Sequence, residues 1–325
     1  MIVGKPHIAV MLVWPFGALR MTKLRTALSA LAILAFMPST AHAWGSEGHR
    51  IIAHLAYEQL TPKAKAEVAG LIAHSSEQGT PSCPIASLED AATWPDCIRP
   101  LHGRWKYLAV DHFEDVPVCQ APGGWTIDAS ASPTRRLDEV IALESALPWC
   151  ENGNCTVAET AKAELVLKDR SRSAADRLEA LEEISHFVGD MHQPLHAADN
   201  HDRGGIDVKV QVNGHASNLH HVWDTEVLEN AVGKDEAAAE AVLRPLVQQH
   251  ARTAAEGDLH DWLMQSHALA QTYVYFKLPQ SPVCGVAGPP QDISQAYLDG
   301  AAPIVREQLA KASIRLAAVL NGLLN

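Results

Sequence analysis

The densest group of residues able to do chemistry lies in residues 185–196, SHFVGDMHQPLH. His186 and Asp190 are four residues apart where a helical pattern ends, which puts an imidazole and a carboxylate on one helix face. His196 follows the break at Pro194 and could therefore serve a second centre. His192 and His196 are also four residues apart, so this pair competes with the first.

A second pair with the same spacing, His220 and Asp224, lies in residues 218–224, NLHHVWD. One such pair is weak evidence, whereas two pairs together are much stronger. Upstream, Asp96 closes the segment ATWPD and His112 lies in DHFED, so each adds a candidate ligand. For Asp96 alone, a helix cap is the alternative role.

Trp44 offers ligands of a different kind. It follows an apolar run at 27–36 and the triplet Ala41-His42-Ala43, the small-residue pattern of a signal-peptidase site. Cleavage after Ala43 would free the α-amine of Trp44, five residues before His49. The amine, the carbonyl oxygen and the imidazole could then chelate one metal ion, but only after export and processing.

The nine candidate ligands fit zinc, because they supply imidazole, carboxylate and amine groups and require no thiolate. Nine positions would serve about three ions at roughly three to four ligands each, which leaves room for water. The carboxylate of Asp190 could bridge two ions, and paired metal ions suit in-line displacement at phosphorus. The nine are Trp44, His49, Asp96, His112, His186, Asp190, His196, His220 and Asp224.

Most of the 17 histidines are not expected to bind metal, since a single histidine is more commonly a surface or hydrogen-bonded residue than a ligand. We expect that ordinary role for His74, His102, His250 and His260. The roles of His192, His201, His215 and His221, which lie near the cluster, stay open.

Residues 1–43 are expected to be an N-terminal extension and a cleaved signal peptide that starts at Met21, with Lys23 and Arg25 as its charged region. A longer signal or an uncleaved anchor is the alternative. No later stretch reaches the roughly 20 apolar residues that span a bilayer. We therefore predict a secreted or periplasmic protein with no stable membrane association.

The formal net charge is −12, and it becomes −16 without residues 1–43, which hold four basic and no acidic residues. Such a surface repels nucleic acid unless cations offset it. The charge argues against a protein that coats a duplex. It is compatible with a metalloenzyme that grips one phosphate, because bound metal ions are often the largest charges in a site.

The mature chain, residues 44–325, is predicted to be a single, mainly helical domain of the all-α class. Apolar stripes at helical spacing run through 51–60, 178–188 and 293–324. Thr61-Pro62 is a helix start, and Ser87 with Asp90 resembles a capping box. Residues 207–217 alternate and contain Asn213-Gly214, which predicts a short β-hairpin and not a sheet. Loops are expected at 114–125 and 279–292.

Six cysteines in an exported chain suggest three disulfides. Cys150 and Cys155 flank a polar turn and could close a short loop. Six cysteines allow about 15 pairings, so the pattern alone does not assign the others. A metal-thiolate role is the alternative for some of them, although the chain has no Cys-x-x-Cys pair.

Taken together, these segments resemble the zinc-dependent, single-strand-specific nucleases of moulds and plants, in the phospholipase C/nuclease superfamily. The motifs are Trp-Gly-x-x-Gly-His at 44–49, Trp-x-Asp at 94–96, His-Phe-x-Asp at 112–115, the segment 186–196, and Asn-Leu-His-x-x-Trp-Asp at 218–224. The resemblance covers most of the mature chain. It implies a helical fold with a trinuclear zinc cluster and endonuclease activity that leaves 5′-phosphates, together with 3′-nucleotidase activity.

The resemblance also implies a ligand set for each ion. Asp96, His112, His186 and Asp190 would hold the inner ion. Trp44, His49 and the other oxygen of Asp190 would hold its partner, and His196, His220 and Asp224 would hold the third. His192 departs from the family pattern, which has a small polar residue there.

Other residues acquire roles from the resemblance as well. Arg99 would face the phosphate, and Asp96 would orient the attacking water or accept its proton. Phe113 would stack on an unstacked base while Asp115 hydrogen-bonds its edge, which explains a preference for single-stranded DNA, RNA and nucleotides. The family disulfides would be Cys150–Cys155 and Cys119–Cys284. Cys83 and Cys97 lie outside the pattern, and their proximity suggests a third bridge.

Two rival functions remain open at this point. A zinc-dependent phospholipase C belongs to the same superfamily, but Phe113 and Asp115 in their motif favour the nuclease. A non-catalytic zinc-binding or storage protein would explain the histidines but not Arg99. We expect a monomer.

Overall fold

The computed structural model describes residues 44–101, 111–119, 135–280, 283–286 and 288–325. The expected signal peptide, His102 and the part of the first expected loop beyond Cys119 lie outside these ranges. Among the described residues, no helix is both long and apolar enough to cross a membrane. The predicted mainly helical fold class is confirmed.

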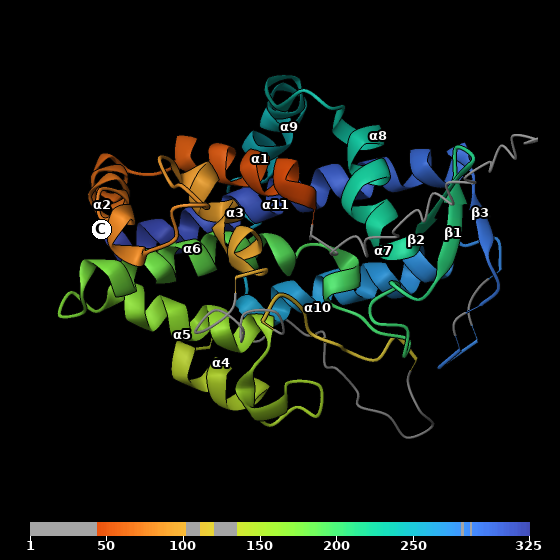
Figure 1. Cartoon of the computed structure of the whole chain (residues 1–325), viewed down its shortest axis with the longest axis horizontal. Coiled ribbons are helices and arrows are strands. Elements are labelled where there is room, and N and C mark those ends of the chain that lie inside the picture. Colours follow the sequence, from red (N-terminus) through yellow and green to blue (C-terminus); the bar gives the residue numbers. More distant parts are fainter. Residues whose placement is uncertain (1–43, 102–110, 120–134, 281–282, 287) are drawn as a thin grey trace, which may run out of the picture. The chain divides into compact units, whose positions relative to one another are not determined.

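Two buried helices form the centre of the fold. α6 (Ala174–Asp190) and α11 (Gln295–Leu324) contact each other, and the remaining elements pack around them (Figure 1). α1 (Gly45–Glu58) packs on both α11 and α3 (Leu88–Ile98), and α3 also packs on α6. One large hydrophobic core runs through these elements, so the ends of α1, α3 and α6 are held against one another.

The other helices cover this centre. α9 (Glu236–His250) and α8 (Leu228–Val232) pack on α11, whereas α5 (Thr156–Lys168) lies against α6 and carries α4 (Leu137–Glu144) on its far side (Figure 1).

Short segments follow the ends of longer elements. They are η4 (Pro194–His196), α7 (Leu219–Val222) and the π-helical η5 (Trp223–Val227). The remaining elements are α2 (Pro62–Ile72), η1 (Ser75–Gln78), η3 (Glu151–Gly153), α10 (Leu259–Leu269) and the π-helical η6 (Ala270–Tyr275).

The helix starts follow the capping residues in the sequence. The Thr61 hydroxyl accepts from the N–H of Ala64 at 3.1 Å, with Pro62 at the first helical position of α2. Ser87 accepts from the N–H of Asp90 at 3.2 Å. The Asp90 carboxylate, however, accepts from the N–H of Ala86 at 3.0 Å, one residue before the position that a capping box requires.

The predicted hairpin forms, but it belongs to a small sheet. β1 (Lys209–Val212) and β2 (His215–Asn218) pair antiparallel around Asn213-Gly214. β3 (Gln291–Ile293) adds to β1 in parallel, giving the order β2-β1-β3. The expectation of a hairpin without a sheet was therefore wrong, as three residues are too short for an alternating pattern to reveal the third strand.

Three disulfides tie the loops to this framework. The structure pairs Cys83 with Cys97, Cys119 with Cys284, and Cys150 with Cys155. The first bridges a loop to α3, which carries Asp96. The second joins segments 165 residues apart, and the third closes a short loop before α5.

Candidate metal centre and substrate pocket

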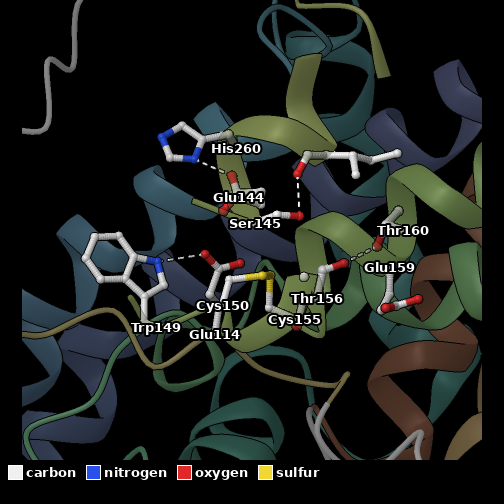
Figure 2. The surroundings of a disulfide bond; sticks show 12 residues. Glu114, Glu144, Ser145, Trp149, Cys150, Cys155, Thr156, Glu159, Thr160 and His260 are labelled. Atoms are coloured by element: carbon white, nitrogen blue, oxygen red, sulfur yellow. Dashed lines mark hydrogen bonds and ion pairs between the residues drawn. A yellow bond between two sulfur atoms is a disulfide. The ribbon is translucent and has the colours of Figure 1, made fainter. Parts of the chain in front are cut away.

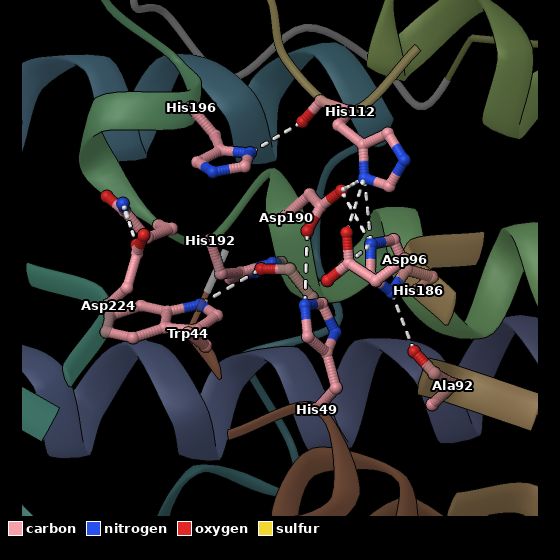
Figure 3. Close-up of polar contacts among 12 residues, drawn as sticks. Trp44, His49, Ala92, Asp96, His112, His186, Asp190, His192, His196 and Asp224 are labelled. Atoms are coloured by element: carbon pink, nitrogen blue, oxygen red, sulfur yellow. Dashed lines mark hydrogen bonds and ion pairs between the residues drawn. The ribbon is translucent and has the colours of Figure 1, made fainter. Parts of the chain in front are cut away.

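The inner part of the candidate site surrounds the carboxylate of Asp190 at the last turn of α6. One oxygen, Oδ1, lies 3.3 Å from Nε2 of His49 on α1. The other, Oδ2, lies 3.0 Å from Nδ1 of His112 and 3.3 Å from Nε2 of His186 (Figure 3). The Asp190 and His186 side chains are fully buried. Asp190 thus lies between two groups of imidazoles, as a bridging ligand would.

Asp96 completes the inner group from α3. Its carboxylate lies 3.8 Å from Nδ1 of His112 and 3.9 Å from Nε2 of His186. It sits inside α3 and not at the helix start, so the capping alternative does not apply. Arg99 donates from Nη1 to Asp96 Oδ1 at 3.1 Å, which brings a guanidinium to the edge of the group.

The outer group consists of His196, His220 and Asp224, all buried. The Nε2 atoms of the two histidines face each other at 3.0 Å. Asp224 Oδ2 lies 3.6 Å from His220 Nε2. The other oxygen of Asp224 accepts from Gln193 Nε2 at 2.8 Å, which orients the carboxylate toward the histidines.

Backbone carbonyls fix three of these imidazoles. Nδ1 of His186 donates to the carbonyl of Ala92 at 2.7 Å, and Nδ1 of His196 donates to that of His112 at 2.6 Å. His220 does the same toward Gly204 at 2.7 Å. A carbonyl only accepts, so Nδ1 carries the proton, and in a neutral ring Nε2 keeps a lone pair directed into the site.

The facing lone pairs require a positive charge between them. Two unprotonated ring nitrogens 3.0 Å apart, as in His196 and His220, repel unless they share a cation. In the inner group, both ring nitrogens of His49, Nε2 of His112 and Oδ1 of Asp190 are buried and have no hydrogen-bond partner among the described residues. Such atoms are expensive to bury, and metal coordination satisfies them. The donor set fits divalent metal ions.

The buried histidines differ in protonation. Burial lowers the pKa of His112 and of His220 to about 4, and that of His196 to about 3. These rings are therefore neutral at pH 7, which is the form that binds a metal. In spite of its burial, the nearby Asp190 and Asp96 raise the pKa of His186 to about 9, so a bound cation would take the place of its proton. Burial, with Asp96 and Asp190 nearby, raises the pKa of Asp224 well above its usual range. A bound cation would reverse that shift, because it stabilises the carboxylate.

Trp44 lies beside the inner group at the start of α1 (Figure 3). Its indole is fully buried and donates from Nε1 to the carbonyl of Gly189 at 3.1 Å, while its own carbonyl accepts from Gly48 at 3.1 Å. A Cβ on Gly189 would lie 2.7 Å from Nδ1 of His49, and one on Gly48 would lie 2.4 Å from Cβ of Trp44. We did not single out these glycines from the sequence, although a glycine between two ligands inside a helix signals such close packing.

A cavity of about 570 Å³ opens beside both groups. Arg99, Phe113 and Asp115 line it together with His112, His196 and His220. Its far wall, which the sequence did not predict, is the loop after η4. That wall comprises Asp199, His201, Arg203, Gly204 and Ile206, with Leu195 beside it.

The other histidines that the sequence analysis considered lie outside the candidate metal groups, although His201 lines the cavity. His192 donates from Nδ1 to the carbonyl of Val188 and accepts from Arg315 Nη1, both at 2.7 Å, so it does not compete with His186 and Asp190. His74, His250 and His260 pair with Glu77, Glu307 and Glu144, as expected for ordinary histidines. The three His/Asp groups include none of His201, His215 and His221.

Comparison with known proteins agrees with this geometry. The family model for S1/P1 nuclease matches residues 44–325. Nuclease P1 of Penicillium citrinum is 28% identical over 86% of this chain and 97% of its own. Nuclease S1 of Aspergillus oryzae is 25% identical over 93% and 97%, and Endonuclease 5 of Arabidopsis thaliana is 25% identical over 92% and 96%. The chain belongs to the S1/P1 nuclease family.

Proposed function

We propose that the protein is an exported, zinc-dependent endonuclease that cleaves phosphodiester bonds of single-stranded DNA and RNA, leaves 5′-phosphates and also acts on 3′-mononucleotides. The observation that carries this proposal is the cavity, in which an arginine and an aromatic ring lie beside two clusters of buried imidazoles and carboxylates. The relatives are named nucleases, so the phospholipase C alternative is not favoured.

The proposal includes three zinc ions and their ligands. Metal ions at such a centre supply Lewis acidity and lower the pKa of bound water. Asp96, His112, His186 and one oxygen of Asp190 would hold the first. His49, the other oxygen of Asp190, and the amine and carbonyl of a processed Trp44 would hold the second. The third would take His196, His220 and Asp224.

The protein's own side chains then bind and orient the substrate. Arg99, held by Asp96, faces the cavity and would stabilise negative charge on the phosphoryl oxygens. Asp96 would orient the attacking water or accept its proton. Phe113 would stack on a base and Asp115 would hydrogen-bond its edge. A base inside a duplex is not free to stack there, which accounts for single-strand preference.

The same proposal covers maturation and location. Residues 1–43 would be removed after Ala43, leaving a domain of residues 44–325 in the periplasm or outside the cell. The mature protein would act as a monomer without a membrane anchor.

The substrate class is tested with matched single-stranded and duplex DNA, single-stranded RNA and phosphatidylcholine. We expect the single strands to be cut at least about tenfold faster than the duplex, because only they expose bases for stacking. Mass spectrometry should find 5′-phosphate ends. EDTA should abolish cleavage and zinc should restore it. Hydrolysis of the lipid alone, or full nuclease activity after exhaustive chelation, contradicts the proposal.

Retaining Ala43 should disable the enzyme, because the Trp44 amine becomes an amide without a lone pair for metal. Protein that begins at Ala43 is compared with protein released at Trp44, by metal analysis and turnover. We expect the longer form to lose about one ion per chain and about 10- to 100-fold in activity. Equal metal content and equal turnover would remove Trp44 from the ligand set.

Gly189→Ala should displace His49, since the new Cβ would lie 2.7 Å from Nδ1 of that ring. The expected result is loss of about one ion per chain and about a tenfold drop in turnover. Gly70→Ala is the matched control, because no atom lies within 4 Å of its Cβ and it lies in α2. Full metal content in Gly189→Ala would show that His49 tolerates the shift and that the close contact is unimportant.

Phe113→Ala should weaken nucleotide binding and leave metal content unchanged. Loss of one stacked base corresponds to about a tenfold rise in KM for a single-stranded oligonucleotide. Phe276→Ala is the control, as Phe276 is 66% exposed and is not among the residues that line the cavity. An unchanged KM in Phe113→Ala would end the assignment of Phe113 to the base site.

A further inference from the structure

A second cluster of buried acidic groups surrounds Glu114, the residue between Phe113 and Asp115 in the sequence (Figure 2). It contains Glu114, which is 1% exposed, and Glu144 at the end of α4, which is fully buried. Neither residue belongs to the three His/Asp groups, and neither is among the residues that line the cavity. The burial of two neighbouring carboxyl groups requires compensating contacts, because burying an acid is unfavourable unless hydrogen bonds satisfy it.

Hydrogen bonds connect the pair to two other elements. The indole Nε1 of Trp149 donates to Glu114 Oε1 at 2.8 Å. His260 on α10 donates from Nδ1 to Glu144 Oε1 at 2.6 Å. The carboxyl groups of Glu114 and Glu144 lie close together, with an oxygen of each within 4.8 Å of the other. α4, α10 and the segment before Cys150 therefore converge on the Glu114 side chain.

The cluster is not a metal site, although Cys155 lies close to both acids. The sulfur of Cys155 is bonded to Cys150 and offers no thiolate. The indole N–H of Trp149 is only a donor and has no lone pair for a cation.

Burial alternates along residues 113–118. Glu114, Val116 and Val118 are buried, whereas Asp115 and Pro117 are exposed and Phe113 is half-buried. The chain turns tightly at Asp115, where the N–H of Val116 donates to the carbonyl of Glu114 at 2.8 Å. With Glu114 buried on one side, Phe113 and Asp115 are left to line the cavity, and a shift of the segment by one residue would exchange the buried and exposed positions.

Backbone hydrogen bonds join the other edge of this segment to the metal-ligand loop. The N–H of Glu114 donates to the carbonyl of His196 at 2.7 Å, and the N–H of Val118 donates to that of Asp199 at 2.9 Å. Backbone hydrogen bonds of this kind are available to any residue, and the valine side chains make only non-directional apolar contacts. The directional contacts of the Glu114 carboxyl group, by contrast, are specific to one register.

We propose that Glu114 is a positioning residue, which fixes the placement of residues 113–118 through the hydrogen bond that it accepts from Trp149 and thereby holds Phe113 and Asp115 toward the nucleotide. This inference rests on the proposed function, because it assumes that the cavity binds a nucleobase. It assigns to Glu114 control of substrate affinity, and not of metal binding or of the hydrolytic step.

The test compares Glu114→Leu with Glu114→Gln in the full mature protein. Leucine removes the acceptor that Glu114 offers to the Trp149 N–H, so we expect KM for a single-stranded oligonucleotide to rise about tenfold, with kcat within about threefold and metal content unchanged. Glutamine still accepts from Trp149, so it should restore KM to within about twofold. Trp149→Phe, which removes the donor of the same hydrogen bond, should also raise KM.

Two controls separate positioning from general loss of structure. Glu164→Leu replaces a buried acid of α5 that belongs to neither cluster, and it should leave KM unchanged. An oligonucleotide that is abasic at the cleavage position cannot use Phe113, so wild type and Glu114→Leu should cleave it with equal kcat/KM.

Three results would overturn the inference: an unchanged KM in Glu114→Leu, an equal defect in Glu114→Gln, or an equal loss on the abasic strand. Failure of the proposed function is distinguishable from all three. In that case the wild-type protein does not cleave single strands at all, whereas binding of a mononucleotide to wild type and Glu114→Leu, measured by calorimetry, still tests the positioning role.

Discussion

The carboxylate of Asp190 is the group on which the rest of the site depends. It is fully buried, and burial of an unpaired carboxylate is strongly unfavourable. Burial alone would raise its pKa, but His186, His112 and His49 more than offset this and hold the pKa well below its usual range. These three partners come from α6, from the segment before residue 113 and from α1. The charge is therefore tolerated only when all three elements are packed together, so assembly of the fold and assembly of the site are one event.

Close packing of the helices supplies the precision that such a centre needs. Gly189 allows His49 on α1 to approach α6, and Gly48 leaves room for the Trp44 side chain. The carbonyls of Ala92, His112 and Gly204 then orient three imidazoles. These carbonyls come from α3 and from two loops, so each imidazole is oriented by an element other than its own. At a metal centre, contacts of this kind change metal affinity by about 10- to 100-fold.

The sequence reveals those features that depend on local chemistry. Thr61-Pro62, Ser87 and Asn213-Gly214 signal helix starts and a turn through their own hydrogen bonds and backbone preferences. The i,i+4 pairs His186–Asp190 and His220–Asp224 are visible because one helix face carries both members. β3, the cavity wall from Asp199 to Ile206 and the Glu114–Glu144 contact are not visible. Each arises where chain segments distant in sequence meet, and no spacing along one segment encodes that meeting.

Metal ions bound at the proposed centre would also supply the positive charge that the protein itself lacks at the cavity. The chain carries a net charge of −12, and both arginines at the cavity are already paired, Arg99 with Asp96 and Arg203 with Asp207. The protein alone therefore offers a polyanion little attraction, and Asp115 and Asp199 add negative charge at the rim. Ions bound by the buried groups would be the main positive charge facing a phosphate. Most of the binding free energy for a nucleic acid would then come from one phosphodiester and its adjacent base. Binding of this kind favours a short contact with a flexible single strand over a long contact with a duplex.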